Sequence, residues 1–396
     1  MAIDTVNPYK IWDARQDPHS VYHQIRANEP VYRAIGPVSG NTFWFITRYA
    51  DCVAALKDAR LTRSWLKIAS ETDREAALQS PEAALGHHML NVDPPEHTRL
   101  RRLVHKAFTP RMIAQMRDDI ETIANDLIDR MDPTTDLISA YAFPVPVTVI
   151  AELLGIPVED QDEFGVWSKT LIYEGDQMKR AVAAMEMIRY FRVLFEQRKA
   201  EPRDDLISAL VAVEEEGDQL TMEELLSMVF LLLAAGHETT VNLIGNGVIT
   251  LLDHPDQLER LRAEPERWPD AIEEILRYQG PVENTLSRWA LEDIPWDGVT
   301  IRRGDTVMVS VMAANRAPAV FQEPDRFDIT REPNKHIAFG NGIHYCLGAP
   351  LARLEGTIAL QTLFERLPDL RITADELTWN PQIIFRGVGT LPVATQ

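Results

Sequence analysis

One cysteine lies in a setting that favours chemistry. Cys346, within FGNGIHYCLG (residues 339–348), is one of two cysteines in the 396-residue chain, and it follows His344 by two positions. Residues 347–350 are expected to start a helix that runs to about Arg366, so the unpaired N–H groups of its first turn can stabilise a thiolate. A structural thiol, a redox or nucleophilic thiol and a metal ligand are the alternatives. Zinc is disfavoured because it needs four ligands, whereas haem iron needs a single thiolate.

A second group of chemically active residues interrupts an apolar segment. AAGHETTVN (residues 234–242) places Gly236 and Glu238 among leucines, although glycine costs a helix about 1 kcal/mol and a buried charge costs more. Several such departures at one place indicate function. Ala235 and Thr239 share a helix face, so small residues there leave room for a ligand beside an acid and an alcohol that can relay protons. A close helix crossing at Gly236, with Glu238 turned to solvent, explains the pattern equally well.

Two further pairs combine charged side chains at helical spacing. Glu274 and Arg277 lie three residues apart, which alone is typical of an exposed ion pair worth a few tenths of a kcal/mol. In DPPEHTRLRRLVHKAF (residues 93–108), two prolines start a helix on which His97 and Arg101 share a face. No second histidine or cysteine accompanies His97 at zinc-ligand spacing, so this pair indicates an anion site, with simple surface solvation as the alternative.

The elements that must position these residues are mostly helical. A capping box at Thr221 starts a helix expected to run to about Asp253, long enough at about 50 Å to cross the molecule. Apolar residues recur three and four apart in two other long stretches, Met112 to Met131 and Ala181 to Arg198. Strands are expected at 42–47 and 306–311, and a long ordered loop at 314–328.

No repeat, low-complexity tract or Gly/Ser-rich linker divides the chain. The expected fold class is therefore mainly α with minor β, as a single domain spanning residues 1–396.

Composition excludes several classes of function. The chain has 60 acidic and 40 basic residues and a net charge of −20, which disfavours nucleic-acid binding. The longest apolar run, residues 228–236, is about half the length of a membrane-spanning helix. The N-terminus lacks the basic and apolar regions of a secretion signal, and two distant cysteines, Cys52 and Cys346, make no disulfide framework. A cytoplasmic protein without a membrane segment is expected.

These motifs together resemble the cytochrome P-450 superfamily, and specifically its soluble bacterial haem-thiolate monooxygenases. The family's cysteine-loop pattern FxxGxHxCxG is matched in full by Phe339, Gly342, His344, Cys346 and Gly348. Residues 235–239 resemble the oxygen-activation motif of the family's long central helix, and Glu274 with Arg277 matches its ExxR motif. The order and spacing agree from residue 93 to FRGVGTLPV (residues 385–393).

The resemblance implies a haem b cofactor (iron protoporphyrin IX) between the long central helix and the cysteine-loop helix. Cys346 would be the proximal iron ligand, with Gly342 and Gly348 letting the backbone approach the sulfur and with Phe339 and Ala235 beside the haem. The propionates would be held by His97, Arg101, Arg288 and His344. The resemblance also implies a structural triad that braces the cysteine loop, formed by Glu274, Arg277 and Arg326.

The implied reaction is hydroxylation or epoxidation by dioxygen, in which Thr239 hydrogen-bonds the dioxygen and Glu238 helps to deliver protons. The substrate is expected to be a mostly apolar macrolide, terpenoid, steroid or fatty acid. By resemblance, the segments that wall its pocket are the central helix, 60–90, 168–182 and 281–287. The contacts expected there are Val282, Leu286, Ile384 and Phe385, with Glu283 and Asn284 as polar contacts.

Electrons are expected from a separate ferredoxin and an NAD(P)H-dependent ferredoxin reductase, because no flavin or iron–sulfur segment is fused. The basic cluster 99–106 suggests that Arg102 and Lys106 dock an acidic ferredoxin, with a solvated helix face as the alternative. The protein is expected to be a monomer. Two other functions stay open: a peroxide-using peroxygenase, against which Glu238 and Thr239 weigh, and a non-catalytic haem-thiolate sensor.

Overall fold

The computed structural model describes residues 9–36, 40–79, 83–173, 176–215 and 217–395. Helices dominate, as the sequence predicts, and strands form a minor part. The α-helices are α1 (Pro18–Asn28), α2 (Tyr49–Ala55), α3 (Glu71–Gln79), α4 (Ala83–Gly86), α5 (Glu96–Ala107), α6 (Pro110–Gln115), α7 (Arg117–Asp129), α8 (Pro144–Leu154), α9 (Gln161–Tyr173), α10 (Gln177–Ala200), α11 (Leu206–Ala212), α12 (Met222–Asp253), α13 (Pro255–Ala263), α14 (Trp268–Gln279), α15 (Val311–Asn315) and α16 (Ala349–Arg366).

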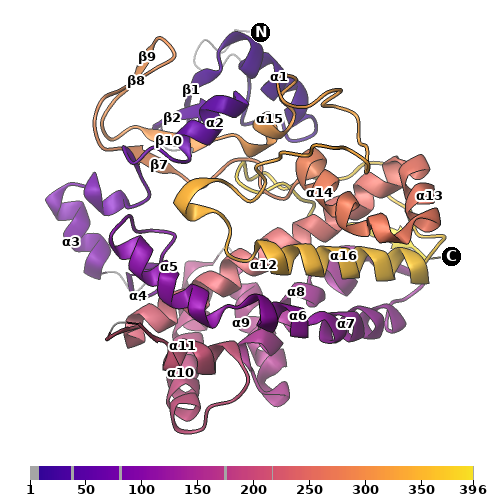
Figure 1. The fold of residues 1–396 in the computed structure, drawn as a ribbon, viewed down its shortest axis with the longest axis horizontal. Helices are drawn as coiled ribbons and strands as arrows, with labels where there is room; N and C mark the ends of the chain where they lie inside the picture. Colours follow the sequence, from indigo (N-terminus) through magenta and orange to yellow (C-terminus); the bar gives the residue numbers. More distant parts are fainter. Residues whose placement is uncertain (1–8, 37–39, 80–82, 174–175, 216, 396) are drawn as a thin grey trace.

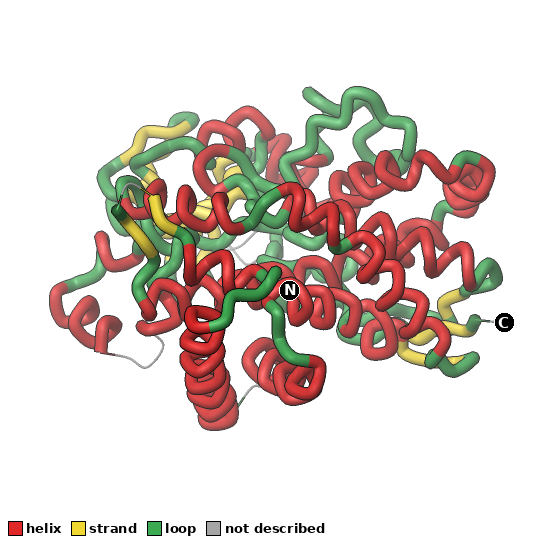
Figure 2. Tube along the Cα trace, turned by 60° about the horizontal axis from the view of Figure 1, so that its bottom comes forward, coloured by secondary structure: helices red, strands yellow, loops and turns green. Residues whose placement is uncertain are grey.

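The strands gather at two places (Figure 2). A five-stranded sheet has the order β1-β2-β10-β7-β3, in which only β2 and β10 pair in parallel, and a three-stranded sheet has the order β11-β12-β4. Two short hairpins, β5-β6 and β8-β9, complete the set. The bounds are β1 (Val31–Ile35), β2 (Thr42–Ile46), β3 (Leu61–Thr62), β4 (Thr134–Asp136), β5 (Glu214–Glu215), β6 (Asp218–Gln219), β7 (Arg288–Ala290), β8 (Ile294–Trp296), β9 (Val299–Ile301), β10 (Thr306–Val309), β11 (Arg371–Ile372) and β12 (Pro392–Ala394).

The central helix α12 crosses the helix-rich part of the molecule, below the five-stranded sheet in the view of Figure 1. The predicted capping box is present: the Thr221 hydroxyl accepts from the N–H of Glu224, whose carboxylate accepts from the N–H of Thr221. Among the described helices, α12 alone is long and apolar enough to cross a membrane, but most of its apolar stretch is buried inside the protein. It is the core helix of this fold.

Two sequence-based boundaries were wrong. The stretch 112–131 is not one helix, because it is divided at Met116 into α6 and α7. The strand expected at 306–311 ends at Val309, because the Ser310 hydroxyl accepts from the N–H of Ala313 and starts α15. At Ser310 a local capping interaction outweighs the periodicity of the apolar residues, whereas the start of α7 at Met116 has no side-chain cap.

Candidate active site

The cysteine loop leads into α16 through a tight turn. Gly340 and Gly342 have φ angles of 74° and 75°, which favour glycine, and the N–H of Cys346 donates to the carbonyl of Phe339 at 2.9 Å. A Cβ at Gly342 would lie 2.9 Å from the carbonyl oxygen of Leu56. Glycine at this position is therefore required by both the backbone conformation and the packing.

Gly348 is different. Its φ is −80°, and a Cβ there would meet no described protein atom within 4 Å. The space beside Gly348 is available to a group bound at Cys346.

The Cys346 thiol is in a mixed electrostatic environment. Desolvation by neighbouring protein atoms raises its pKa, whereas the backbone N–H groups of Gly348 and Ala349 and the guanidinium groups of Arg101 and Arg353 favour the thiolate. The net direction is upward. A cation bound at the sulfur would favour the thiolate. The other cysteine, Cys52, is buried and donates to the carbonyl of Ile46 at 3.2 Å, and both cysteines are free thiols.

A buried ion pair braces the loop that leads to the cysteine. Arg277 donates two 2.7 Å hydrogen bonds to Glu274, and the two side chains are 0% and 1% exposed, so the exposed-pair interpretation was wrong. The expected third member, Arg326, contributes only its backbone carbonyl, which accepts from Arg277 at 3.0 Å, while its own guanidinium is exposed. The side chain that completes the triad is Arg331, whose Nε lies 3.1 Å from Glu274.

Glu273 forms a second brace that sequence reasoning missed. It pairs with Arg353 at 2.6 Å and with His336 at 3.1 Å, and the Arg353 guanidinium lies over the Phe339 ring, 4.5 Å from its centroid. These interactions join α14, the cysteine loop and α16. They lower the pKa of Glu273 to about 2, against the opposing effect of burial.

A cluster of cationic groups and ring nitrogens lies beside the loop. The His97 and His344 rings are 4.5 Å apart, and the pKa of His344 is lowered to about 3 by burial and by Arg288, His97 and Arg63. Among the described residues, both ring nitrogens of His97, the Nε2 of His344 and the Nε of Arg288 are buried without a hydrogen-bond partner. Burial of such groups is costly unless an anion satisfies them, so the cluster fits an anionic ligand.

Two arginines in this region donate to backbone carbonyls. Arg101 donates to the carbonyl of Tyr345 at 2.7 Å, so it contacts the residue before Cys346. Arg63, which sequence reasoning missed, is buried beside the cluster and donates to the carbonyls of Leu90 and Ser287. An isolated arginine outside any motif provided no signal that could have identified it.

The small residues of α12 lie level with the cysteine loop. A Cβ at Gly356 would lie 2.9 Å from Leu243, and a Cβ at Gly247 would lie 2.5 Å from Leu360. The two helices α12 and α16 therefore run parallel, and in both contacts the residue of α16 has a number 113 higher than its neighbour on α12. Extending this register places Ala235 level with Gly348. Ala235 and Gly236 are exposed, although they lie midway along a core helix. A flat group between the two helices fits this opening.

The acid and the alcohol are in place on α12. The Thr239 hydroxyl donates to the carbonyl of Ala235 at 2.7 Å. Desolvation raises the pKa of Glu238, which has no hydrogen-bond or ion-pair partner among the described residues. His237 faces the opposite side, where its buried ring packs on Phe143 with centroids 4.6 Å apart. Glu238 is thus set up to keep its proton at a higher pH than an exposed glutamate does.

The four expected substrate contacts lie on two paired segments. Val282 and Phe385 form an antiparallel bridge, and the N–H of Glu283 donates to the carbonyl of Ile384 at 2.9 Å. Val282, Leu286, Ile384 and Phe385 are each partly exposed. The two expected polar contacts were wrong: Glu283 and Asn284 are buried and hydrogen-bonded to residues near the N-terminus.

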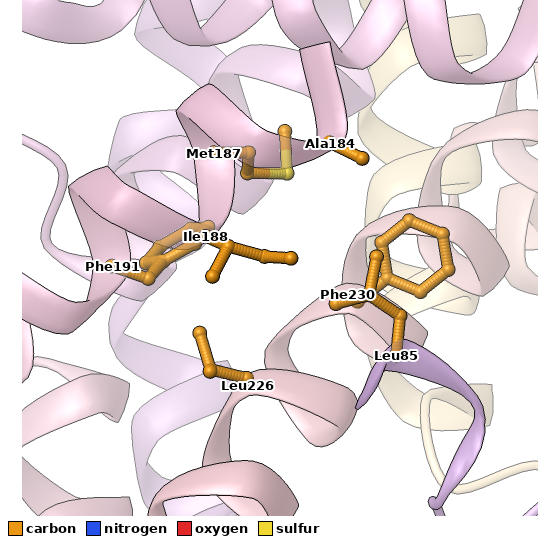
Figure 3. Close-up of a pocket in the computed structure, with 7 residues that line it drawn as sticks. All are labelled: Leu85, Ala184, Met187, Ile188, Phe191, Leu226 and Phe230. Atoms are coloured by element: carbon orange, nitrogen blue, oxygen red, sulfur yellow. The ribbon is translucent and has the colours of Figure 1, made fainter. Parts of the chain in front are cut away.

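An apolar pocket lies between α4, α10 and α12 (Figure 3). Its walls are formed by Leu85, Ala184, Met187, Ile188, Phe191, Leu226 and Phe230. Leu85 belongs to the predicted wall 60–90, whereas the α10 residues lie just beyond the predicted 168–182. Residues 80–82 and 174–175 of those segments lie outside the described residues. Sequence reasoning missed Phe230, whose signal was a single aromatic residue within a run of leucines.

These features fit haem. A single cysteine at a helix start, an unsatisfied cationic cluster for two carboxylates and an opening beside small residues are what an iron porphyrin needs from a protein.

Comparison with known proteins agrees with this assignment. Residues 164–368 match the model of the family described as cytochrome P-450. Cytochrome P-450 107B1 of Saccharopolyspora erythraea is 47% identical over 389 residues, which cover 96% of this chain and 95% of that protein. The cytochrome P-450 monooxygenase PikC of Streptomyces venezuelae is 43% identical, over an alignment that covers 96% of this chain and 92% of PikC.

Solved structures agree as well. The polyketide-synthase cytochrome P-450 PksS of Bacillus subtilis superposes with a TM-score of 0.90 at 42% identity, over 97% of this chain and 98% of PksS. The chain belongs to the cytochrome P-450 family of haem-thiolate monooxygenases.

Proposed function

We propose that this protein hydroxylates or epoxidises a mostly apolar small molecule, with macrolide-type polyketides as the first class to test, and that its cofactor is haem b. The observation that carries the proposal is the acid–alcohol pair on α12, in which the Thr239 hydroxyl donates to the carbonyl of Ala235 and burial raises the pKa of Glu238. A sensor does not need a proton donor in this position, and a peroxygenase receives its oxygen already reduced.

The cofactor would be held from two sides. Cys346 would ligate the iron, and His97, Arg288 and His344 would donate to the propionates with nitrogens that have no other partner among the described residues. When bound, the haem supplies activation of dioxygen, favoured by electron donation from the thiolate. The braces at Glu274 and Glu273 keep the cysteine loop rigid, so that the sulfur is held in one position.

Thr239 and Glu238 would manage protons at the distal face. Rotation of the Thr239 hydroxyl away from the Ala235 carbonyl would leave it able to donate a hydrogen bond into the space beside Ala235. Glu238 has a raised pKa, so its carboxyl can hold a proton and release it toward that hydroxyl or a water between them.

The names of relatives support the substrate class. The 6-deoxyerythronolide B hydroxylase of Saccharopolyspora erythraea and the mycinamicin IV hydroxylase/epoxidase of Micromonospora griseorubida are 41% and 40% identical to this chain. The partly exposed side chains of Val282, Leu286, Ile384 and Phe385 suit an apolar ring or chain. Terpenoids, steroids and fatty acids have the same apolar character and belong in the same screen.

Electrons would come from a ferredoxin and an NAD(P)H-dependent ferredoxin reductase. Arg102 and Lys106 are exposed on α5, the helix whose Arg101 contacts the carbonyl next to Cys346. An acidic ferredoxin docked there would lie on the thiolate side of the haem. A monomer in the cytoplasm, with residues 1–396 forming one haem domain, completes the proposal.

The test is product formation under three conditions. Purified protein with a surrogate ferredoxin, its reductase and NADH should oxidise a macrolide that first shifts the haem absorption band. If hydrogen peroxide alone yields product as fast as NADH with the redox partners does, the protein is a peroxygenase. Ligand-induced band shifts without product in either condition identify a sensor and contradict the proposal.

A further inference from the structure

A buried polar network joins the N-terminal segment to one wall of the active site. Arg15, which precedes α1, donates to both carboxylate oxygens of Glu283, at 3.1 and 2.6 Å. Tyr22 on α1 donates to the same carboxylate at 2.8 Å. The Arg15 and Glu283 side chains are 13% and 1% exposed, so the interaction is screened from solvent.

The next residue of the wall is held by the same tyrosine. Asn284 donates to the Tyr22 hydroxyl at 2.7 Å and to the carbonyl of Ile383 at 2.6 Å. Tyr22 therefore accepts from Asn284 while it donates to Glu283. A single hydroxyl fixes two consecutive side chains of the segment that carries Val282 and Leu286.

The opposing wall segment is tied to the same stretch of chain. Arg15 donates through Nε to the carbonyl of Asn380 at 3.2 Å, and Arg386 donates to the carbonyl of Arg15. Arg386 also lies over the Trp379 ring, 3.5 Å from its centroid. Residues 380–386, which carry Ile384 and Phe385, are thereby attached to Arg15 as firmly as residues 281–286.

We infer that Arg15 and Tyr22 are positioning residues for substrate recognition, acting through Glu283 and Asn284 on the paired wall segments. The inference rests on the proposed active site. The argument is geometric: anchoring Glu283 and Asn284 to α1 and to the segment before it restricts the direction in which their neighbour Val282 can face. Its bridge partner Phe385 is restricted in the same way, because Asn284 also binds the carbonyl of Ile383.

The smallest informative change is Tyr22→Phe, which removes one hydroxyl and keeps the ring. Glu283 keeps its Arg15 partner, so the fold is retained, but Asn284 loses an acceptor. Arg15→Lys is the second variant, because it keeps the charge and loses the two-point contact. Tyr49→Phe is the matched control: its hydroxyl donates to the carbonyl of Lys335 at 2.7 Å, which belongs to neither wall segment.

The readout is the ratio of two dissociation constants measured on the haem-loaded protein. Imidazole ligates the iron and is too small to contact the walls, whereas 4-phenylimidazole ligates the iron and presses its ring against them. We expect Tyr22→Phe and Arg15→Lys to raise the constant for 4-phenylimidazole relative to imidazole by about threefold or more, and Tyr49→Phe to leave the ratio unchanged.

Two failures can be told apart. If the wild-type protein does not bind imidazole at the iron, the proposed active site is wrong and the positioning role falls with it. If the wild-type protein binds both ligands, and the two variants lower the unfolding temperature while the ratio stays at its wild-type value, Arg15 and Tyr22 are structural only and the inference is overturned.

Discussion

Glu274 and Arg277 form a two-point ion pair in which both side chains are inside the protein. Their two hydrogen bonds are each 2.7 Å long. Arg277 also donates to the backbone carbonyls of Asn315, Pro324 and Arg326, so one guanidinium fixes the long loop before the cysteine at three points. Because the pair is fully desolvated, removing Glu274 leaves the buried charge of Arg277 uncompensated, which costs about 3–5 kcal/mol.

Arg331 is the third member of this group, so its loss should be far more damaging than the loss of Arg326. Arg331→Met removes a 3.1 Å contact with Glu274 and hydrogen bonds to the carbonyls of Gln322, Glu323 and Arg326. We expect a destabilisation of about 2–4 kcal/mol in urea unfolding, together with reduced haem retention.

Arg326→Met is the matched control, because its guanidinium is 59% exposed and pairs only with the exposed Glu323. A change within about 0.5 kcal/mol is expected. Equal destabilisation by the two substitutions would show that the sequence-based triad, with Arg326 as its third member, was right.

This correction illustrates what the sequence could and could not predict. The spacing of Glu274 and Arg277 specifies a shared helix face but not whether that face is buried, since burial depends on a loop some 50 residues away in the chain. Likewise, the resemblance identifies the correct loop, but Arg326 and Arg331 are both arginines of that loop, and only the folded backbone shows which one turns inward.

Local signals were more reliable where one interaction dominates. The capping box at Thr221 correctly located the start of α12, and the glycines at 340 and 342 correctly indicated a tight turn. Glu283 and Asn284 were misassigned because alternation along a short extended segment does not say which side faces the site. Their partners Arg15 and Tyr22 are more than 250 residues distant in sequence, beyond the reach of any spacing argument.

Thr239→Ala should uncouple reductant consumption from product formation. The hydroxyl donates to the carbonyl of Ala235, and its removal takes away a hydrogen-bond donor beside the Ala235 opening. We expect NADH consumption to persist while product per NADH falls severalfold and hydrogen peroxide rises. The neighbouring Thr240→Ala, at a buried position on another face of α12, should keep wild-type coupling. Unchanged coupling in Thr239→Ala would remove Thr239 from the mechanism.

Glu355 on α16 should make stability depend on pH. Burial raises the pKa of its carboxyl from the ordinary 4.5 to about 8, and its Oε2 has no hydrogen-bond partner among the described residues. Between these two values the folded protein binds more protons than the unfolded chain. Stability therefore falls as pH rises from about 4.5 to about 8, by about 1.4 kcal/mol per pH unit.

Glu355→Gln removes this proton linkage. The measured quantity is the free energy of unfolding of the variant minus that of the wild type. This difference should increase by about 3 kcal/mol between about pH 5.5 and about pH 7.5. Glu365→Gln, an exposed position near the end of the same helix, controls for the loss of one negative charge. A gain that does not change with pH would show that Glu355 is already ionised in the folded protein.

Docking of an acidic ferredoxin at α5 should depend on salt. Replacing both Arg102 and Lys106 with glutamate is expected to slow reduction by ferredoxin about tenfold or more at low ionic strength, and the difference should shrink as salt screens the charges. The measurement is the stopped-flow rate of haem reduction. In the control variant Lys199→Glu, at an exposed position on α10, the haem should be reduced at the wild-type rate. Rates indifferent to both the substitutions and the salt would place the docking surface elsewhere.

The most direct test concerns the bond between Cys346 and the iron. The dithionite-reduced protein with carbon monoxide should show the red-shifted Soret band typical of thiolate-ligated haem, and Cys346→His should move that band to the shorter wavelength typical of histidine ligation while haem is retained. A wild-type complex that already absorbs at the shorter wavelength, or a Cys346→His variant that keeps the red-shifted band, would contradict the assignment of Cys346 as the proximal ligand.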